Sequence, residues 1–114
     1  MPSREEQLED ARLRNKALLD TLRGKHAVLD QHRQVEHHFW SGSQKSAAQL
    51  ARELYVRGFL VLKLAPSDAD PPEWSVDAEH KSTALQAASE DTVRQMVDLA
   101  RRFDSVYDGW GTSL

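Results

Sequence analysis

The first third of the chain has a hydrophobic pattern with the period of an α-helix. Apolar residues and one asparagine recur at alternating spacings of three and four residues, which gathers them on one side of a helix: Leu8, Ala11, Asn15, Leu18 and Leu22. Ser3 and Glu6 form a capping box at its start, and Gly24 suits its C-terminal end. We therefore predict a helix between Ser3 and Gly24. Its apolar face is short, so packing onto the rest of the domain is favoured over a coiled coil.

From residue 34 onward, strand-like and helix-like segments follow one another. Four segments have the composition or the alternation of β-strands: residues 34–40, 59–64, 73–80 and 105–112. Ser43 and Ser89 are suitable N-caps for two amphipathic helices, of which the first ends at Gly58 and the second at Arg102. Prolines make residues 65–72 a loop.

The predicted order after the first helix is β-α-β-β-α-β. The economical solution is an α+β fold, the ferredoxin-like sandwich, in which a four-stranded antiparallel sheet carries both helices on one face. The first and third strands are then central, and the last strand lies at an edge. We predict residues 1–33 as an N-terminal helix with its connecting loop, and residues 34–114 as the ferredoxin-like domain.

The last strand contains Trp110 between Gly109 and Gly111. A tryptophan between glycines needs either close backbone packing or an exposed position for a partner. Strict alternation places Trp110 on the same face as Asp108 and Val106, with both glycines on the other face. We therefore expect Trp110 on the open face of the sheet.

Charge is spread unevenly along the chain. The net charge is −3, made up of +1 for residues 1–33 and −4 for residues 34–114. Acidic residues without an intervening lysine or arginine gather in one stretch: Asp68, Asp70, Glu73, Asp77 and Glu79. Such a stretch is either a solvated loop or a surface that suits a basic protein partner, and no cationic patch for nucleic acid is visible.

The sequence offers little catalytic or metal-binding chemistry. The chain has no cysteine, which excludes disulfides, a thiol nucleophile and cysteine-ligated zinc. His37 and His38 are adjacent on a predicted strand and point to opposite faces, so we expect one packed in the sheet, one at its surface, and no metal site. The serines suit caps and turns, and Asp108 has no identifiable partner for acid–base work. We expect neither an enzyme nor a cofactor.

The N-terminus is too polar for a signal peptide, and no apolar run reaches transmembrane length. A cytoplasmic protein without a membrane partner is expected.

An RNA-binding sheet is one alternative, because RNA-recognition modules share this topology and stack bases on aromatic side chains. However, carboxylates on or beside the open face would repel the phosphates of RNA. These carboxylates belong to Glu36, Asp77, Glu79 and Asp108. No motif typical of RNA-recognition strands is present, so we expect no direct binding of nucleic acid.

The C-terminal hexapeptide Tyr107-Asp108-Gly109-Trp110-Gly111-Thr112, which follows the predicted helix, closely resembles the signature of the ribonuclease E inhibitor B family, also called regulator of ribonuclease activity B (RraB). Glu6-Gln7-Leu8-Glu9 and Val35-Glu36-His37-His38 also look like the family pattern at the expected spacing. The resemblance covers nearly the whole chain, although only the hexapeptide is specific by itself.

The resemblance implies a ferredoxin-like domain without catalysis of its own. Members of the family bind the endoribonuclease ribonuclease E in its non-catalytic C-terminal region, inhibit RNA cleavage and alter the composition of the degradosome, so that RNA abundance changes. That region is rich in arginine, which gives the acidic stretch of residues 68–79 a counterpart.

We therefore expect a protein-binding regulator of ribonuclease E. Its candidate contact residues are Asp108, Trp110, Asp68, Asp70, Glu73, Asp77 and Glu79. The alternatives are an interaction or oligomerisation module with another partner, which could form a homo-oligomer through an edge strand, and a direct RNA-binding domain.

Overall fold

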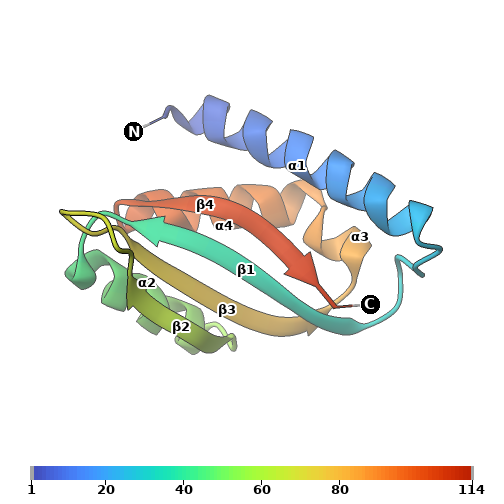
Figure 1. Ribbon diagram of the computed structural model, residues 1–114. Helices are drawn as coiled ribbons and strands as arrows, with labels where there is room; N and C mark the ends of the chain where they lie inside the picture. Colours follow the sequence, from blue (N-terminus) through green and yellow to red (C-terminus); the bar gives the residue numbers. More distant parts are fainter. Residues whose placement is uncertain (1, 114) are drawn as a thin grey trace.

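A four-stranded antiparallel sheet forms the centre of the protein in a computed structural model, which describes residues 2–113 (Figure 1). The elements are α1 (Arg4–Gly24), β1 (Arg33–Ser41), α2 (Gln44–Val56), β2 (Leu60–Pro66), β3 (Trp74–Ser82), α3 (Ala84–Ala87), α4 (Glu90–Arg102) and β4 (Ser105–Thr112). All the predicted strands and helices are present, with boundaries that differ by at most two residues.

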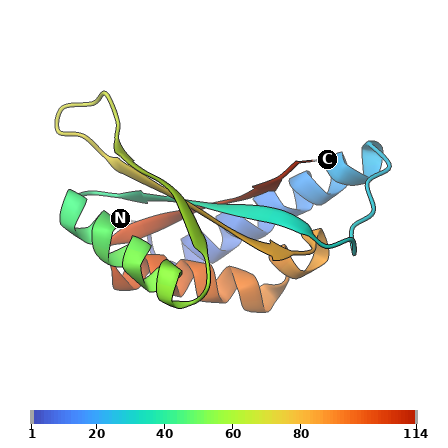
Figure 2. The ribbon, with the colours of Figure 1, turned by 90° about the horizontal axis from the view of Figure 1, so that it is seen from below.

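The strand order is β2-β3-β1-β4, with every neighbouring pair antiparallel. β1 and β3 are central, and β4 lies at an edge, as predicted. This is the ferredoxin-like arrangement with an additional N-terminal helix. The helices lie on one side of the sheet, whereas the other side is open (Figure 2).

The side chains that point from the sheet toward the helices form the main core. Phe39 of β1 and Val76 of β3 pack with Leu50 and Leu54 of α2 and with Val97 of α4, and each of these side chains is at most 1% exposed. A smaller cluster at the end of the sheet near the C-terminus contains Leu22, Val35, Ala84, Ala87 and Trp110. The inward-pointing side chains of the strands and the apolar faces of α2 and α4 therefore pack against each other in one buried layer.

Helix α1 lies beside α4 and along β4, so it extends the helix layer beyond the edge of the sheet (Figures 1 and 2). Leu8 and Ala11 join the main core, and Leu22 joins the smaller cluster. The predicted packing of this helix onto the domain is confirmed.

Helix α3 was not predicted. It is a single turn in which the Thr83 side chain accepts a hydrogen bond from the backbone N–H of Gln86. Such a turn is shorter than one hydrophobic period, so alternation along the sequence cannot reveal it.

Candidate protein-interaction site

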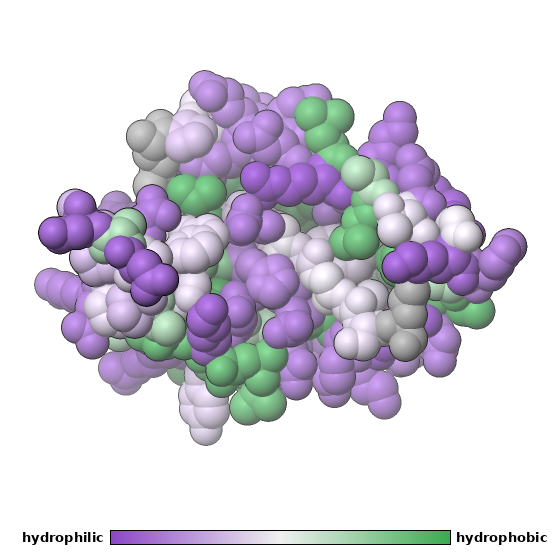
Figure 3. Space-filling view, in the orientation of Figure 1, coloured by the Kyte–Doolittle hydropathy of each residue, from purple (hydrophilic) through white to green (hydrophobic). Residues whose placement is uncertain are grey.

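The open face of the sheet carries the polar half of each alternating strand. In β1, Val35, His37 and Phe39 point toward the helices and are buried. Glu36, His38 and Trp40 alternate with them and therefore point to the open side. Residues directly opposite each other on two paired strands lie on the same face of the sheet. The open-face residues of β1 are therefore paired with open-face residues of β3: Glu36 with Glu79, His38 with Asp77, and Trp40 with Ser75. Figure 3 looks onto this face, which is mostly hydrophilic over the central strands.

Two acidic residues of this face are bonded within the protein. The Nδ1 atom of His38 lies 2.9 Å from Oδ1 of Asp77. Asp108 accepts a hydrogen bond from Nε1 of Trp40 at 3.2 Å and forms an ion pair with Arg14 of α1 at 3.0 Å. The predicted placement of Asp77 and Asp108 on the open face is therefore confirmed, and each of these carboxylates has a partner.

Glu36 and Glu79 differ from these residues. They are directly opposite each other on the two central strands, and both are partly exposed. Neither forms an ion pair with another residue in the range 2–113. Like charges directly opposite each other destabilise a sheet, so this pair is unfavourable for the isolated domain.

The surface beside Glu36 lacks a side chain at Gly111. Gly111 of β4 is opposite Glu36 on its other side. A Cβ atom at Gly111 would lie 3.9 Å from Nε2 of His38 and would meet no other atom within 4 Å. The absence of a side chain there therefore keeps the area beside Glu36 and His38 open.

The remaining acidic candidates lie on the loop between β2 and β3. Asp68, Asp70 and Glu73 are exposed there. Ser67 fixes the loop, since its hydroxyl oxygen accepts hydrogen bonds from the backbone N–H groups of Ala69 and Glu73. The loop rises on the open side of the sheet, away from the helices (Figure 2). The predicted acidic stretch is thus divided between a loop and the sheet, with both parts on the same side of the domain.

The predicted orientation of Trp110 is wrong. The register shifts in the ladder between β1 and β4, because Phe39 is opposite Tyr107 whereas His37 is opposite Trp110. Two residues of β4, Asp108 and Gly109, are opposite the single residue His38 of β1, and this arrangement is a β-bulge. Gly109 has a φ of 93°, a conformation that glycine adopts readily. The extra residue reverses the alternation, so Tyr107 and Trp110 both point to the helix side.

Trp110 is consequently a core residue, only 7% exposed. Its Nε1 donates a hydrogen bond to Oδ1 of Asn15 at 2.8 Å, and Nδ2 of Asn15 donates to the carbonyl oxygen of Ala88 at 3.4 Å. A contact between Trp110 and a partner stays a prediction, and it would require the ring to leave this packed position.

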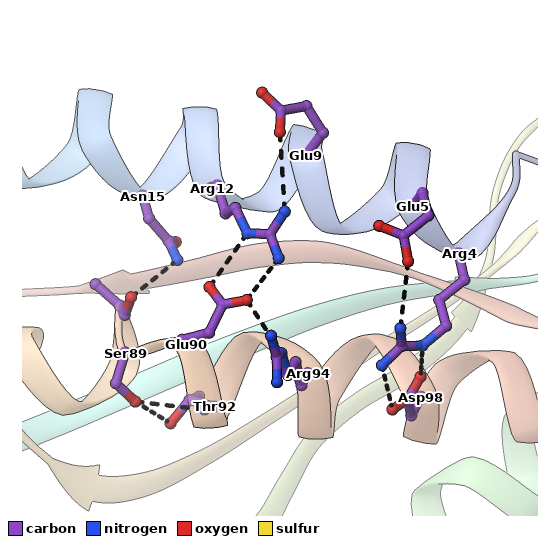
Figure 4. A network of polar contacts seen from close by, with 11 residues as sticks. Arg4, Glu5, Glu9, Arg12, Asn15, Ser89, Glu90, Thr92, Arg94 and Asp98 are labelled. Atoms are coloured by element: carbon purple, nitrogen blue, oxygen red, sulfur yellow. Dashed lines mark hydrogen bonds and ion pairs between the residues drawn. The ribbon is translucent and has the colours of Figure 1, made fainter.

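Exposed ion pairs join α1 to α4 (Figure 4), and α1 also carries Arg14 and Asn15, which bond to Asp108 and Trp110 of β4. Arg4 bonds Asp98 at 2.7 Å, and Arg12 bonds Glu90 at 3.1 Å. The Arg12 guanidinium lowers the pKa of the Glu90 carboxyl, and the Arg4 guanidinium lowers the pKa of the Asp98 carboxyl. Both acidic partners therefore stay ionised, and the pairs persist, well below neutral pH.

A buried polar group lies under the sheet on the helix side. His37 is fully buried, and its Nδ1 lies 2.7 Å from the hydroxyl of Tyr107. Its Nε2 has no hydrogen-bond partner among the described residues. Burial lowers the pKa of His37 to about 3 and raises the pKa of Tyr107. The expectation of one packed histidine and one surface histidine is confirmed, since His38 is partly exposed.

No group of three or more histidine, aspartate and glutamate side chains among residues 2–113 is placed to hold a metal ion. Nor is any helix in this described part of the chain long and apolar enough to span a bilayer.

The free edge of β2 has features that oppose strand pairing. Lys63 is exposed on it, Pro66 ends it, and the register shifts between Val61 and Lys63. Lysine, proline and bulges are the devices by which sheet edges avoid pairing with another chain. Oligomerisation through an edge strand stays a prediction, which this edge does not favour.

Comparison with known proteins gives two findings. A family model described as "Regulator of ribonuclease activity B" matches residues 13–112. A relative from Photobacterium profundum, named "Regulator of ribonuclease activity B", is 31% identical over 83 residues, which cover 68% of this chain. The matched part corresponds to 62% of the length of that relative.

Proposed function

Because the chain belongs to the family of regulators of ribonuclease activity B, we propose that it binds ribonuclease E in the non-catalytic C-terminal region of that enzyme and inhibits RNA cleavage. Binding there alters the composition of the degradosome and thereby RNA abundance. The chain acts by docking in the cytoplasm and contributes no catalytic group. The observation that carries the proposal is the family match over residues 13–112, which include every strand of the sheet.

The distribution of charge supports docking onto a basic partner. Asp68, Asp70 and Glu73 are exposed on a loop that rises on the open side of the sheet, and Asp77 and Glu79 lie on the sheet itself. Acidic groups on one side of a domain steer a cationic partner and fix its orientation. The same carboxylates repel RNA phosphates, so the regulator acts on the enzyme and not on its substrate.

The test is retention of the chain by immobilised ribonuclease E C-terminal region at low salt, with the immobilised catalytic region as control. We expect retention by the first and not by the second. In a cleavage assay, the chain should slow full-length ribonuclease E and leave an enzyme that lacks the C-terminal region unaffected, because the docking site is then missing. No retention at low salt would contradict the proposal.

A further inference from the structure

The charges of the open face do not balance. Asp77 is bonded to His38, and Asp108 is bonded to Arg14 and Trp40, whereas Glu36 and Glu79 have no ion-pair partner among residues 2–113. Two lysines of this face are at other positions in the ladder: Lys63 is opposite Asp77, and Lys81 is opposite Gln34. The face therefore presents two adjacent carboxylates that form no ion pair among residues 2–113 and that a cationic group of another molecule would neutralise.

Apolar surface flanks the unmatched pair. Trp40 lies on the same strand as Glu36 and is 37% exposed, with its indole N–H held by Asp108. Leu60 is opposite Glu79 on β2 and is 58% exposed. A hydrophobic patch is visible over β2 at the lower margin of the face (Figure 3). A ligand of this surface thus meets negative charge at the centre and apolar groups on two sides.

We propose that the open face of the sheet is a docking surface for an extended segment of a partner protein that is rich in arginine or lysine. One cationic side chain lies over the Glu36 and Glu79 carboxylates, and the absence of a side chain at Gly111, on the other side of Glu36, leaves room for the segment. A second lies over the ring of Trp40, where a cation is attracted by the ring face. The inference rests on the proposed function, since it names the surface by which the regulator holds its basic partner.

The spacing of the two contacts defines the segment further. Glu36 and Trp40 are four residues apart on β1, which is roughly 13 Å along a strand. An extended segment that runs along the sheet matches this distance with basic residues at positions i and i+4. Such a segment keeps its two cationic side chains on one side, because successive residues of an extended chain alternate.

The test is titration of the full chain with a synthetic ten-residue peptide of serine and threonine that carries two arginines four positions apart. Isothermal titration calorimetry at low salt gives the affinity. The variant E36K/E79K should lose at least about tenfold in affinity, because attraction becomes repulsion. The neutral variant E36Q/E79Q should also bind more weakly.

A matched control separates the face from net charge. Asp10 and Asp30 are exposed and form no ion pair with another described residue, so D10K/D30K changes the net charge by the same amount as E36K/E79K. It should lose less than about threefold, the loss expected from long-range charge alone. D68K/D70K tests the loop in the same way. Circular dichroism and thermal unfolding confirm that each variant is folded.

The outcomes are distinct. Equal losses for E36K/E79K and D10K/D30K, no binding of the peptide, a loss confined to D68K/D70K, or binding of single-stranded RNA in place of the peptide would each overturn the inference. Retention of E36K/E79K by the ribonuclease E C-terminal region would overturn the inference and leave the proposed function standing. Peptide binding that depends on Glu36 and Glu79, without retention by ribonuclease E, would leave the docking surface and remove the proposed partner.

Discussion

The two faces of the sheet are made from the same strands and differ in what holds them. His37 and His38 are neighbours in the chain, yet the first is fully buried against Tyr107, whereas the second is partly exposed and bonded to Asp77. The helix side is stabilised by the burial of its side chains, whereas the side chains of the open face are held by contacts between charged and polar groups. Substitutions on the helix side should therefore change the free energy of unfolding, whereas substitutions on the open side should mainly change binding.

The largest expected effect is on the helix side. Trp110→Ala should lower the free energy of unfolding by roughly 3–5 kcal/mol, since it empties a packed position and removes the hydrogen bond to Asn15. Urea unfolding measures it. Trp40→Ala is the matched control on the open face and should cost far less. A stable Trp110→Ala variant with lost partner binding would instead restore the exposed role first predicted for this residue.

Acid should destabilise the helix side through His37. Its pKa in the folded protein is about 3, against an ordinary value of 6.5, so below pH 6.5 the unfolded chain takes up a proton that the folded chain does not. This contribution to stability is fully present above pH 6.5 and is lost as the pH falls toward 3, by about 1.4 kcal/mol per pH unit. Burial lowers the pKa of His80 as well, which adds a slope of the same sign.

Urea unfolding at several pH values between 4 and 7 measures this slope. His37→Gln should flatten it, whatever the stability of that variant at neutral pH. His32→Gln, at an exposed position, is the control and should keep the slope. An unchanged slope in His37→Gln would assign the acid sensitivity to other groups.

A smaller effect is expected at the contact between α1 and β4. Asn15→Ala leaves Nε1 of Trp110 buried without an acceptor, which should cost about 1–3 kcal/mol. Thermal or urea unfolding measures the loss. Leu13→Ala, on the exposed side of the same helix, should have little effect, because Leu13 is 59% exposed. Equal losses in the two variants would show that the bond to Trp110 does not account for the cost of Asn15→Ala, because alanine itself favours the helix.

The smallest effect, of opposite sign, is expected on the open face. Glu36→Lys replaces the like-charge pair with Glu79 by an opposite-charge pair and should stabilise the domain by roughly 0.2–1 kcal/mol. Glu36→Gln should stabilise it less. Both are read from urea midpoints at low and high salt, and the gain should shrink at high salt. A destabilised Glu36→Lys variant would show that the two carboxylates do not repel each other in the folded protein.

Most of the fold could be predicted because alternation and caps are local signals. Ser43 and Ser89 each cap a helix as expected, and the alternation of Trp74, Val76 and Ala78 gave β3. The β4 bulge could not be derived by counting alternate residues, since a single extra residue reverses every later position. Gly109 was the available signal, because a glycine inside a strand often marks a bulge.

The candidate site was predictable only in part. Alternation places Glu36, Asp77 and Glu79 on the open face, and the structure agrees. That Asp77 and Asp108 are matched while Glu36 and Glu79 are not depends on cross-strand register and on Arg14 of α1. These contacts join residues far apart in the chain, so no local pattern contains them.

The bulge at Asp108 and Gly109 also changes what the C-terminal hexapeptide signifies. Its two aromatic residues, Tyr107 and Trp110, both point toward the helices, and the positive φ of Gly109 forms the bulge that places both on that side. The residues of this motif therefore maintain the fold of the domain. Two proteins could share it while their open faces evolve toward different partners, so the surface of the sheet, and not the motif, is where functional divergence within such a family should be sought.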